Sequence, residues 1–342
     1  MLKIGDRIIA DDLPPYIIAE LGVNHDGSLE RALELTHIAH RAKADAIKLQ
    51  YFQAEKLMSR ACRLAEYQAN AGETDPVDML SRLELPLDAM SRVVSLAHQL
   101  HMHAIVTVFS VELVAEAGKL LWDAFKVASP DVINHPLLDA LARIGKPLLV
   151  STGAADMNEI LRTESWLKGY PHTFFQCVSA YPTPIHYASI AGRIAMQRAG
   201  VPALGYSDHT TGIETGAIAV ASGARILEKH LTHDRKASGP DHAASLDEGG
   251  FAHYVRLSHE AFAMLGPQEK RVLPIEQDVR SVSRQSLVTV RRLRSGEIIR
   301  NTDIAIKRPG TGIAPFELDR IINRATVREI AADTPIMESD LA

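Results

Sequence analysis

Short apolar runs alternate with longer amphipathic stretches over most of the chain. The runs are rich in Val, Ile, Leu, Ala and Phe, which is typical of buried strands, whereas the stretches between them carry apolar residues at helical spacing. In residues 29–43, Leu33, Ile38 and Ala42 stand among charged neighbours, so one face of a helix can be buried. This alternation predicts strand–helix units around a parallel sheet.

Eight of the apolar runs qualify as strands. They are Tyr16–Glu20, Ala46–Gln50, His103–Val108, Ala124–Val127, Pro147–Ser151, Thr173–Gln176, Ala203–Tyr206 and Ile226–Lys229. Eight strands over about 250 residues favour a closed (β/α)8 TIM barrel over an open doubly wound sheet. We expect residues 1–12 to form a small hairpin at the lower end of that barrel.

The pattern changes after Gly266-Pro267. A charged segment is followed by short apolar runs that are interrupted at residues 294–296 and 308–310. We therefore expect a barrel domain over residues 1–265, a linker over 266–282 and a small second domain over 283–342. About 60 residues is near the lower limit for independent folding, so we expect the small domain to gain stability from a partner surface.

Composition narrows the functional class. The chain of 342 residues is 46% hydrophobic and carries a net charge of −5, which offers no general attraction to nucleic acid or anionic membranes. No apolar run approaches the ~20 residues of a membrane span, and residues 1–12 lack the apolar core of a secretory signal. We expect a cytoplasmic protein acting on small molecules. Cys62 and Cys177 are too few for a disulfide framework, and we expect reduced thiols.

Polar residues gather where the predicted strands end, which is where barrels of this kind carry their active sites. Lys48 and Lys126, with the hydroxyls of Thr107, Ser129 and Ser207, resemble a cradle for a phosphate or carboxylate. A lysine on the barrel axis loses its hydration and needs a negative partner. Two partners are open at this stage, namely an anionic ligand or a strand-end acid such as Glu20 or Glu228.

Two histidines, His209 and His230, end adjacent predicted strands and can bind a divalent metal through imidazole nitrogens. With fifteen His in the chain, a chance placement at two strand ends is the alternative. Asp241, in Gly239-Pro240-Asp241-His242, follows the last strand in a loop that can return a carboxylate over the barrel mouth. A plain polar turn is the other interpretation of this segment.

Several motifs together resemble one family, the sialic acid synthases, including those that make legionaminic and pseudaminic acids. They are Ile18-Ala19-Glu20-Leu21-Gly22-Val23-Asn24-His25, Lys48-Leu49-Gln50, Ala65-Glu66-Tyr67-Gln68, Ser151-Thr152-Gly153, Tyr181-Pro182-Thr183-Pro184, Ser207-Asp208-His209-Thr210-Thr211-Gly212, Glu228-Lys229-His230 and Gly239-Pro240-Asp241-His242. From Ser283 onward the chain resembles the antifreeze-like (SAF, β-clip) domain of that family, including Lys307-Arg308-Pro309-Gly310-Thr311-Gly312-Ile313.

The resemblance implies a reaction and a role for each matching residue. The reaction joins phosphoenolpyruvate, an N-acylated amino-sugar aldehyde and water into a nine-carbon 2-keto sugar acid and phosphate. The implied metal is Mn²⁺, with Mg²⁺ or Co²⁺ as substitutes, held by His209 and His230. The implied phosphoenolpyruvate-binding residues are Lys48, Thr107, Lys126, Ser129 and Ser207; Glu20, Glu228 and Asp241 match catalytic positions, and Ser179, Tyr181, Asp241 and Arg308 match positions around the sugar. The family forms domain-swapped homodimers, in which Arg308 reaches the partner's barrel.

Two positions depart from the family pattern. Pro130 stands where relatives usually have glycine after the serine, and it removes one backbone N–H from the loop that follows Lys126. Ser179 stands where some sialic acid synthases carry asparagine. The resemblance therefore extends to the reaction class and not to the particular sugar.

Two rival functions come from other classes. A metal-dependent barrel hydrolase or lyase can use two histidines and nearby carboxylates, but it gives the paired lysines no role. A non-enzymatic binder of ice or carbohydrate through the small domain is disfavoured, because that region is rich in Arg rather than flat and rich in Thr.

Overall fold

The structure is a computed structural model that describes residues 1–59, 61–65, 68–69, 72–267 and 269–342. Of the motifs named above, Glu66 and Tyr67 lie outside the described residues. The chain divides into two compact units, Met1–Gly266 and Pro267–Ala342. Each has its own hydrophobic core.

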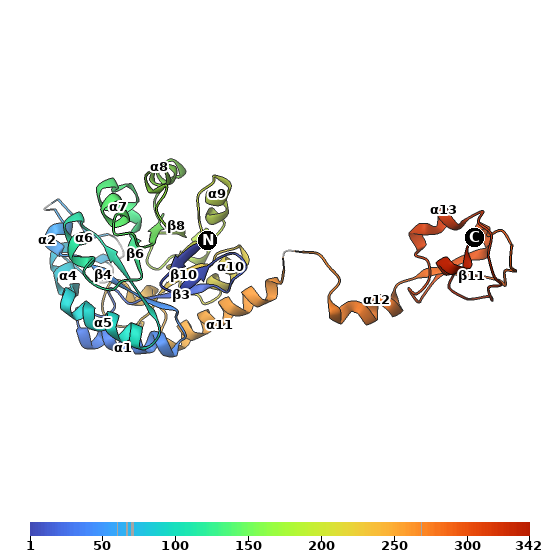
Figure 1. The fold of residues 1–342 in the computed structure, drawn as a ribbon. Helices are drawn as coiled ribbons and strands as arrows, with labels where there is room; N and C mark the ends of the chain where they lie inside the picture. Colours follow the sequence, from blue (N-terminus) through green and yellow to red (C-terminus); the bar gives the residue numbers. More distant parts are fainter. Residues whose placement is uncertain (60, 66–67, 70–71, 268) are drawn as a thin grey trace. The chain divides into compact units, whose positions relative to one another are not determined.

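The first unit is a closed parallel barrel of eight strands, as the sequence predicts (Figure 1). The strands are β3 (Tyr16–Glu20), β4 (Ala46–Tyr51), β5 (His103–Val108), β6 (Ala124–Val127), β7 (Leu148–Ser151), β8 (His172–Cys177), β9 (Gly205–Asp208) and β10 (Ile226–His230). Each strand pairs with the next along the chain, and β10 closes the ring against β3.

Helices follow the strands and cover the outside of the barrel (Figure 1). They are α1 (Leu29–Arg41), α2 (Ala54–Leu57), α4 (Pro76–Leu83), α5 (Leu87–Gln99), α6 (Val111–Ala117), α7 (His135–Ala142), α8 (Met157–Leu167), α9 (Gly192–Arg198), α10 (Thr215–Ala221) and α11 (Glu248–Leu265). Helix α1 begins where Ser28 accepts a hydrogen bond from the amide of Arg31, and it buries Leu35, Ile38 and Ala39. Its bounds agree closely with the amphipathic pattern of residues 29–43.

The interior of the barrel changes from apolar to polar along the strands. Successive side chains of a strand point to opposite faces, so every second residue faces the axis. At the lower end the inward residues are apolar, and Ile18, Ile105 and Phe175 pack against Ile4 and Ile9 of the antiparallel hairpin formed by β1 (Leu2–Ile4) and β2 (Arg7–Ile9). Two residues further along the same strands, the next inward side chains are polar. The strands themselves therefore position the site.

The second unit is a small β-rich domain. Strands β11 (Ser286–Thr289) and β12 (Ile304–Lys307) pair antiparallel, and a core that includes Leu287, Leu293 and Ile336 lies beside them. A short helix, α13 (Leu318–Ile321), contributes Ile321 to that core. Before β11 the chain forms helix α12 (Gln277–Ser283), so part of the predicted linker is helical.

Candidate active site

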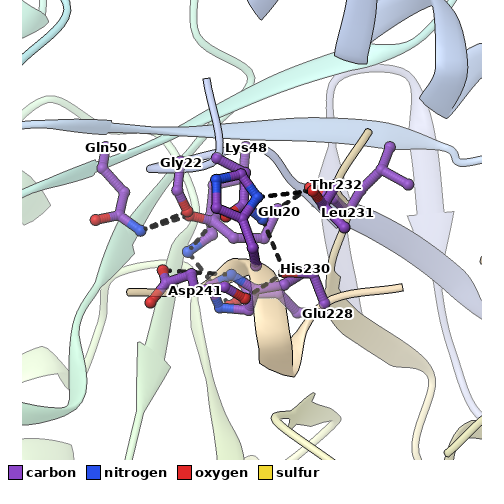
Figure 2. A network of polar contacts seen from close by, with 12 residues as sticks. Glu20, Gly22, Lys48, Gln50, Glu228, His230, Leu231, Thr232 and Asp241 are labelled. Carbon is purple, nitrogen blue, oxygen red and sulfur yellow. Dashed lines mark hydrogen bonds and ion pairs between the residues drawn. The ribbon is translucent and has the colours of Figure 1, made fainter. Parts of the chain in front are cut away.

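Two buried lysines and two buried glutamates form the centre of the barrel mouth. Figure 2 shows three of these four, Lys48, Glu20 and Glu228. The Lys48 ammonium lies 3.0 Å from Glu20 Oε2 and 3.2 Å from Glu228 Oε1. Lys126 Nζ lies 3.0 Å from the same Glu228 oxygen. All four side chains are inward residues of β3, β4, β6 and β10, at most 5% exposed.

Hydroxyl and amide side chains surround these charges. Lys48 Nζ donates to Thr107 Oγ1 (3.2 Å), and Ser207 Oγ donates to Glu228 Oε1 (3.1 Å). Gln50 donates through Nε2 to Glu20 Oε1 (2.7 Å) and to the carbonyl oxygen of Gly22 (2.9 Å). In the free protein the lysines are therefore paired with strand-end acids. This is one of the two alternatives that the sequence allows, the other being an anionic ligand. Within the described residues, Glu228 Oε2 still lacks a hydrogen-bond partner.

Burial and charge shift the pKa values of these groups in different directions. Burial raises the pKa of Glu20 to about 7, although Lys48 opposes the shift. Burial also disfavours the charged form of Glu228, but Lys126 and Lys48 outweigh it and hold the Glu228 pKa far below its ordinary value. The result is one permanently ionised carboxylate and one that titrates near neutrality.

The two lysines also differ. Burial lowers the pKa of Lys126, and Glu228 compensates only in part. For Lys48 the carboxylates of Glu20 and Glu228 outweigh burial, so its pKa is raised. Two cations beside two carboxylates leave the centre without net charge when all four groups are ionised.

The two predicted histidine ligands lie together at the rim of this centre. The rings of His209 and His230 are 5.5 Å apart between centroids, and the Tyr181 ring lies 4.1 Å from His209 and 5.9 Å from His230. Asp241 Oδ2 is 3.6 Å from His230 Nδ1, and burial raises the pKa of Asp241 to about 6. The loop after β10 thus brings Asp241 over the mouth, so this segment is more than a polar turn.

The two histidines fit a divalent metal. His209 Nδ1 donates to the carbonyl oxygen of Val178 (2.7 Å), so Nε2 is the ring nitrogen left outside this hydrogen bond. Burial disfavours the charged form of His209, but Cys177 and the Val178 backbone outweigh it, so the pKa of His209 is raised. Burial and the neighbouring His209 hold the pKa of His230 well below its ordinary value, so its imidazole is neutral, and in the described part of the chain its Nδ1 has no hydrogen-bond partner. Metals bind neutral imidazoles whose second ring nitrogen is held by a partner; His209 has the backbone partner, and His230 is neutral.

A third group of small polar residues lies where β6, β7 and β8 end. Ser129 Oγ accepts a hydrogen bond from the Gly153 amide (3.0 Å) and lies 3.6 Å from Cys177 Sγ. A β-carbon on Gly153 would stand 2.2 Å from Ser179 Oγ and 2.9 Å from Ser129 Oγ. Ser129 and Ser179 therefore converge on Gly153, and only glycine leaves space between them.

The structure adds Cys177 to the residues found from the sequence. Its thiol lies 3.8 Å from His209 Nδ1 and is an inward residue of β8, two positions after Phe175. The alternation along β8 places Cys177 on the inward face with Phe175, and this is the sequence signal that could have revealed it. Arg308 is an exposed residue of the second unit, after β12.

In the described part of the chain, no helix is long and apolar enough to cross a membrane. Among the same residues, no group of three or more His, Cys, Asp or Glu side chains is arranged to hold a metal ion.

A closed parallel barrel with a buried, mixed-charge centre at the C-terminal ends of its strands defines a TIM-barrel protein whose candidate site lies at the end where such barrels carry their active sites. Residues 35–270 match the NeuB family model, and residues 284–342 match the SAF domain. The chain belongs to the NeuB family and carries a C-terminal SAF domain.

Individual relatives extend the comparison. An uncharacterized protein of Methanocaldococcus jannaschii is 34% identical, covering 99% of this chain and 98% of its own. The N,N'-diacetyllegionaminic acid synthase of Legionella pneumophila is 33% identical over 94% of this chain and 93% of its own. The crystal structure of N-acetylneuraminic acid synthetase from Leptospira borgpetersenii serovar Hardjo-bovis, in complex with citrate, has a TM-score of 0.74, with 30% identity over 81% of this chain and 94% of that one.

Proposed function

We propose that the chain condenses phosphoenolpyruvate with an N-acylated amino-sugar aldehyde and water to give a nine-carbon 2-keto sugar acid and phosphate. The observation that carries the proposal is the centre of Lys48, Lys126, Glu20 and Glu228 beside His209 and His230 in one barrel mouth. A doubly anionic substrate matches the two lysines, and the sialic-acid-type relatives match the reaction.

Phosphoenolpyruvate binds where the lysines lie. Lys48 and Lys126 bind its carboxylate and phosphate, with Thr107, Ser129 and Ser207 as hydroxyl donors. The substrate anions then take over part of the role that Glu228 has in the free protein, where its Oε1 contacts both ammonium groups. The reactive CH₂ carbon is thereby held towards the histidine side of the mouth.

The sugar binds on the other side, against Tyr181, Ser179 and Asp241. A divalent ion on His209 and His230, Mn²⁺ or in its place Mg²⁺ or Co²⁺, supplies Lewis-acid polarisation of the aldehyde when bound. The CH₂ carbon of phosphoenolpyruvate forms the new C–C bond to the aldehyde carbon, and the aldehyde oxygen takes a proton. The neighbouring enol carbon becomes electron-deficient, and water adds to it.

Glu20 acts on that water. Its pKa of about 7 lets the carboxylate take a proton at neutral pH, and Gln50 fixes the orientation of the side chain through its 2.7 Å hydrogen bond. The tetrahedral carbon then expels phosphate by C–O cleavage, and Lys126 and Lys48 stabilise the departing charge.

The second unit completes the sugar site in this proposal. The exposed Arg308 of one chain reaches the acyl-amino group of the sugar in the barrel of a second chain, as in a domain-swapped homodimer. Two observations support this role of Arg308. The segment from Lys307 to Ile313 resembles the family, and it lies within the SAF domain.

Phosphate release with Mn²⁺ and an acceptor panel tests the proposal. The acceptors are N-acetylmannosamine, 2,4-diacetamido-trideoxymannose and its altrose-configured counterpart, and mass spectrometry identifies the product. We expect release that depends on one acceptor, with a matching nine-carbon acid. Release without any acceptor would instead indicate a hydrolase, and no release from folded, metal-loaded protein would contradict the proposal.

A further inference from the structure

His242 is buried one residue beyond Asp241, and both of its ring nitrogens are bonded. Nε2 lies 3.0 Å from Asp26 Oδ1, in the loop that follows β3. Nδ1 lies 2.7 Å from Thr232 Oγ1, at the start of the loop that follows β10. A carboxylate oxygen accepts only, so Nε2 carries a proton that points to Asp26, and Nδ1 shares a hydrogen bond with the Thr232 hydroxyl. The same Thr232 oxygen also lies 3.1 Å from the carbonyl oxygen and 3.1 Å from the amide nitrogen of Asp234, so it holds this loop as well as the ring.

A second set of bonds joins the same two loops beneath Asp241. Asn24 Nδ2 donates to the carbonyl oxygen of Leu231 (2.9 Å) and to Ser245 Oγ (2.7 Å). Ser245 Oγ in turn donates to the carbonyl oxygen of Asp241 (2.6 Å). The backbone carbonyl of Asp241 is therefore tied through Ser245 to Asn24, in the loop after β3. The Val23 backbone, in the same loop, opposes the rise in the Asp241 pKa that burial causes.

The His242 ring packs closely against the backbone of Gly239. A β-carbon on Gly239 would lie 2.7 Å from His242 Cδ2, and the Gly239 backbone has a φ of +150°, which favours glycine. The ring is 1% exposed and Thr232 is fully buried. The ring cannot move without breaking both bonds, and Asp241 precedes it directly in the chain.

We propose that Asp26, His242 and Thr232 form a brace that positions the Asp241 carboxylate beside His230, which makes His242 and Thr232 positioning residues for binding of the acceptor sugar. Figure 2 shows Thr232 and Leu231 on the chain segment that continues from His230, and Asp241 on the other side of that histidine. The expected effect on the KM for the acceptor rests on the proposed function. The expected effect on the structure of the loop can be measured in the free protein, without any reaction.

No bond of the brace includes Lys48, Lys126 or the hydroxyls of Thr107, Ser129 and Ser207, which are the proposed phosphoenolpyruvate-binding groups. Loss of the brace should therefore act on the sugar alone, whereas a general loss of stability would act on both substrates.

Thr232→Val and Thr232→Ser form the central pair of variants. Valine keeps the shape of threonine and removes the hydroxyl, while serine keeps the hydroxyl. We expect Thr232→Val to raise the KM for the acceptor about tenfold and to leave the KM for phosphoenolpyruvate within about twofold. Thr232→Ser restores the wild-type value. His242→Gln should behave like Thr232→Val.

His103 offers a matched control at the opposite end of the barrel. It has the same kinds of partner, the Tyr16 hydroxyl at 2.9 Å and Asp6 Oδ1 at 3.0 Å. His103→Gln should lower the melting temperature without changing either KM. Equal changes in both KM values for Thr232→Val, or a change in neither, would overturn the proposal.

A measurement on the free protein separates this inference from the proposed reaction. Amide hydrogen exchange of residues 231–246 should be faster in Thr232→Val and His242→Gln, and unchanged in Thr232→Ser and His103→Gln. If the wild-type protein turned over none of the acceptors, the proposed function would be contradicted. The hydrogen-exchange result would still show whether the brace exists. Unchanged exchange in Thr232→Val would overturn the brace even in an active enzyme.

Discussion

Glu228 holds two ammonium groups through one carboxylate oxygen, so a change at this residue leaves two buried cations with less compensation. In the proposed function, an incoming phosphate or carboxylate would replace this shared contact. The same arrangement makes the free protein sensitive to the loss of that single oxygen.

Glu228→Gln should therefore destabilise the free protein by about 3 kcal/mol, in the range of broken buried ion pairs. Chemical denaturation of the metal-free protein measures the change. Glu248→Gln is the matched control, because it removes an equally close but exposed partner of Arg41 at 2.7 Å, and little change is expected there. Equal losses in the two variants would contradict the special position of Glu228.

Glu20→Gln should separate binding from chemistry. The amide keeps the size of the side chain but cannot accept a proton from water, so we expect turnover to fall ~10²- to 10⁴-fold, as for other general bases. Calorimetric titration should show that phosphoenolpyruvate still binds, through Lys48, Lys126 and the hydroxyl side chains. Wild-type turnover in this variant would remove Glu20 from the chemistry.

At the scale of elements, the alternation along each strand assigns neighbouring charges to different tasks. On β9 and β10, Ser207 and Glu228 face the centre, whereas Asp208 and Lys229 face outward and pair with each other at 3.0 Å. Lys229 also lies over the Tyr254 ring of α11. A buried ion pair thus joins the barrel wall to its helical cover one residue away from the site.

The hydrophobic pattern predicts the strands well where they consist of apolar residues. It fails at β9, which was expected over residues 203–206 and runs from Gly205 to Asp208. Ser207 and Asp208 are polar and suggest a loop, and only tertiary partners, Glu228 inside and Lys229 outside, reveal them as strand. The pairing of the lysines with strand-end acids was left open for the same reason, since one sequence cannot give distances between strands.

The β1–β2 hairpin should contribute stability and no specificity. Ile4 is fully buried against the lower ends of the strands, so Ile4→Ala should cost about 2–4 kcal/mol in denaturant unfolding. Both KM values should remain unchanged, because the site lies at the other end of the barrel. Ile8, which is 45% exposed, gives the control Ile8→Ala, and an equal loss there would contradict the packing argument.

At the scale of the whole molecule, the division into two units places Arg308 outside the barrel unit that holds the other candidate site residues. An enzyme built this way can assemble each site from two chains. The proposed homodimer then has two sites, each combining one barrel with the second unit of the partner.

Mixing two variants with complementary defects tests that assembly at a sugar concentration well below the KM of Arg308→Ala. Arg308→Ala should raise the KM for the sugar more than that for phosphoenolpyruvate, and Glu20→Gln should lower turnover ~10²- to 10⁴-fold. After the two proteins are unfolded and refolded together, exchange between chains gives mixed dimers with one intact site, and about a quarter of wild-type activity should return. No recovery in verified mixed dimers would contradict the shared site, and each variant refolded alone is the control.

Closure of the barrel by β10 against β3 also has a consequence for biosynthesis. Glu20 stands on the first barrel strand, and its backbone carbonyl accepts the amide of Leu231, just past the last strand. While the ribosome is still translating the intervening residues, the first strand has no such neighbour, and the acidic and basic groups of the future centre remain in water. A nascent chain that stalls before this strand emerges therefore has most of the fold's helices but no catalytic centre.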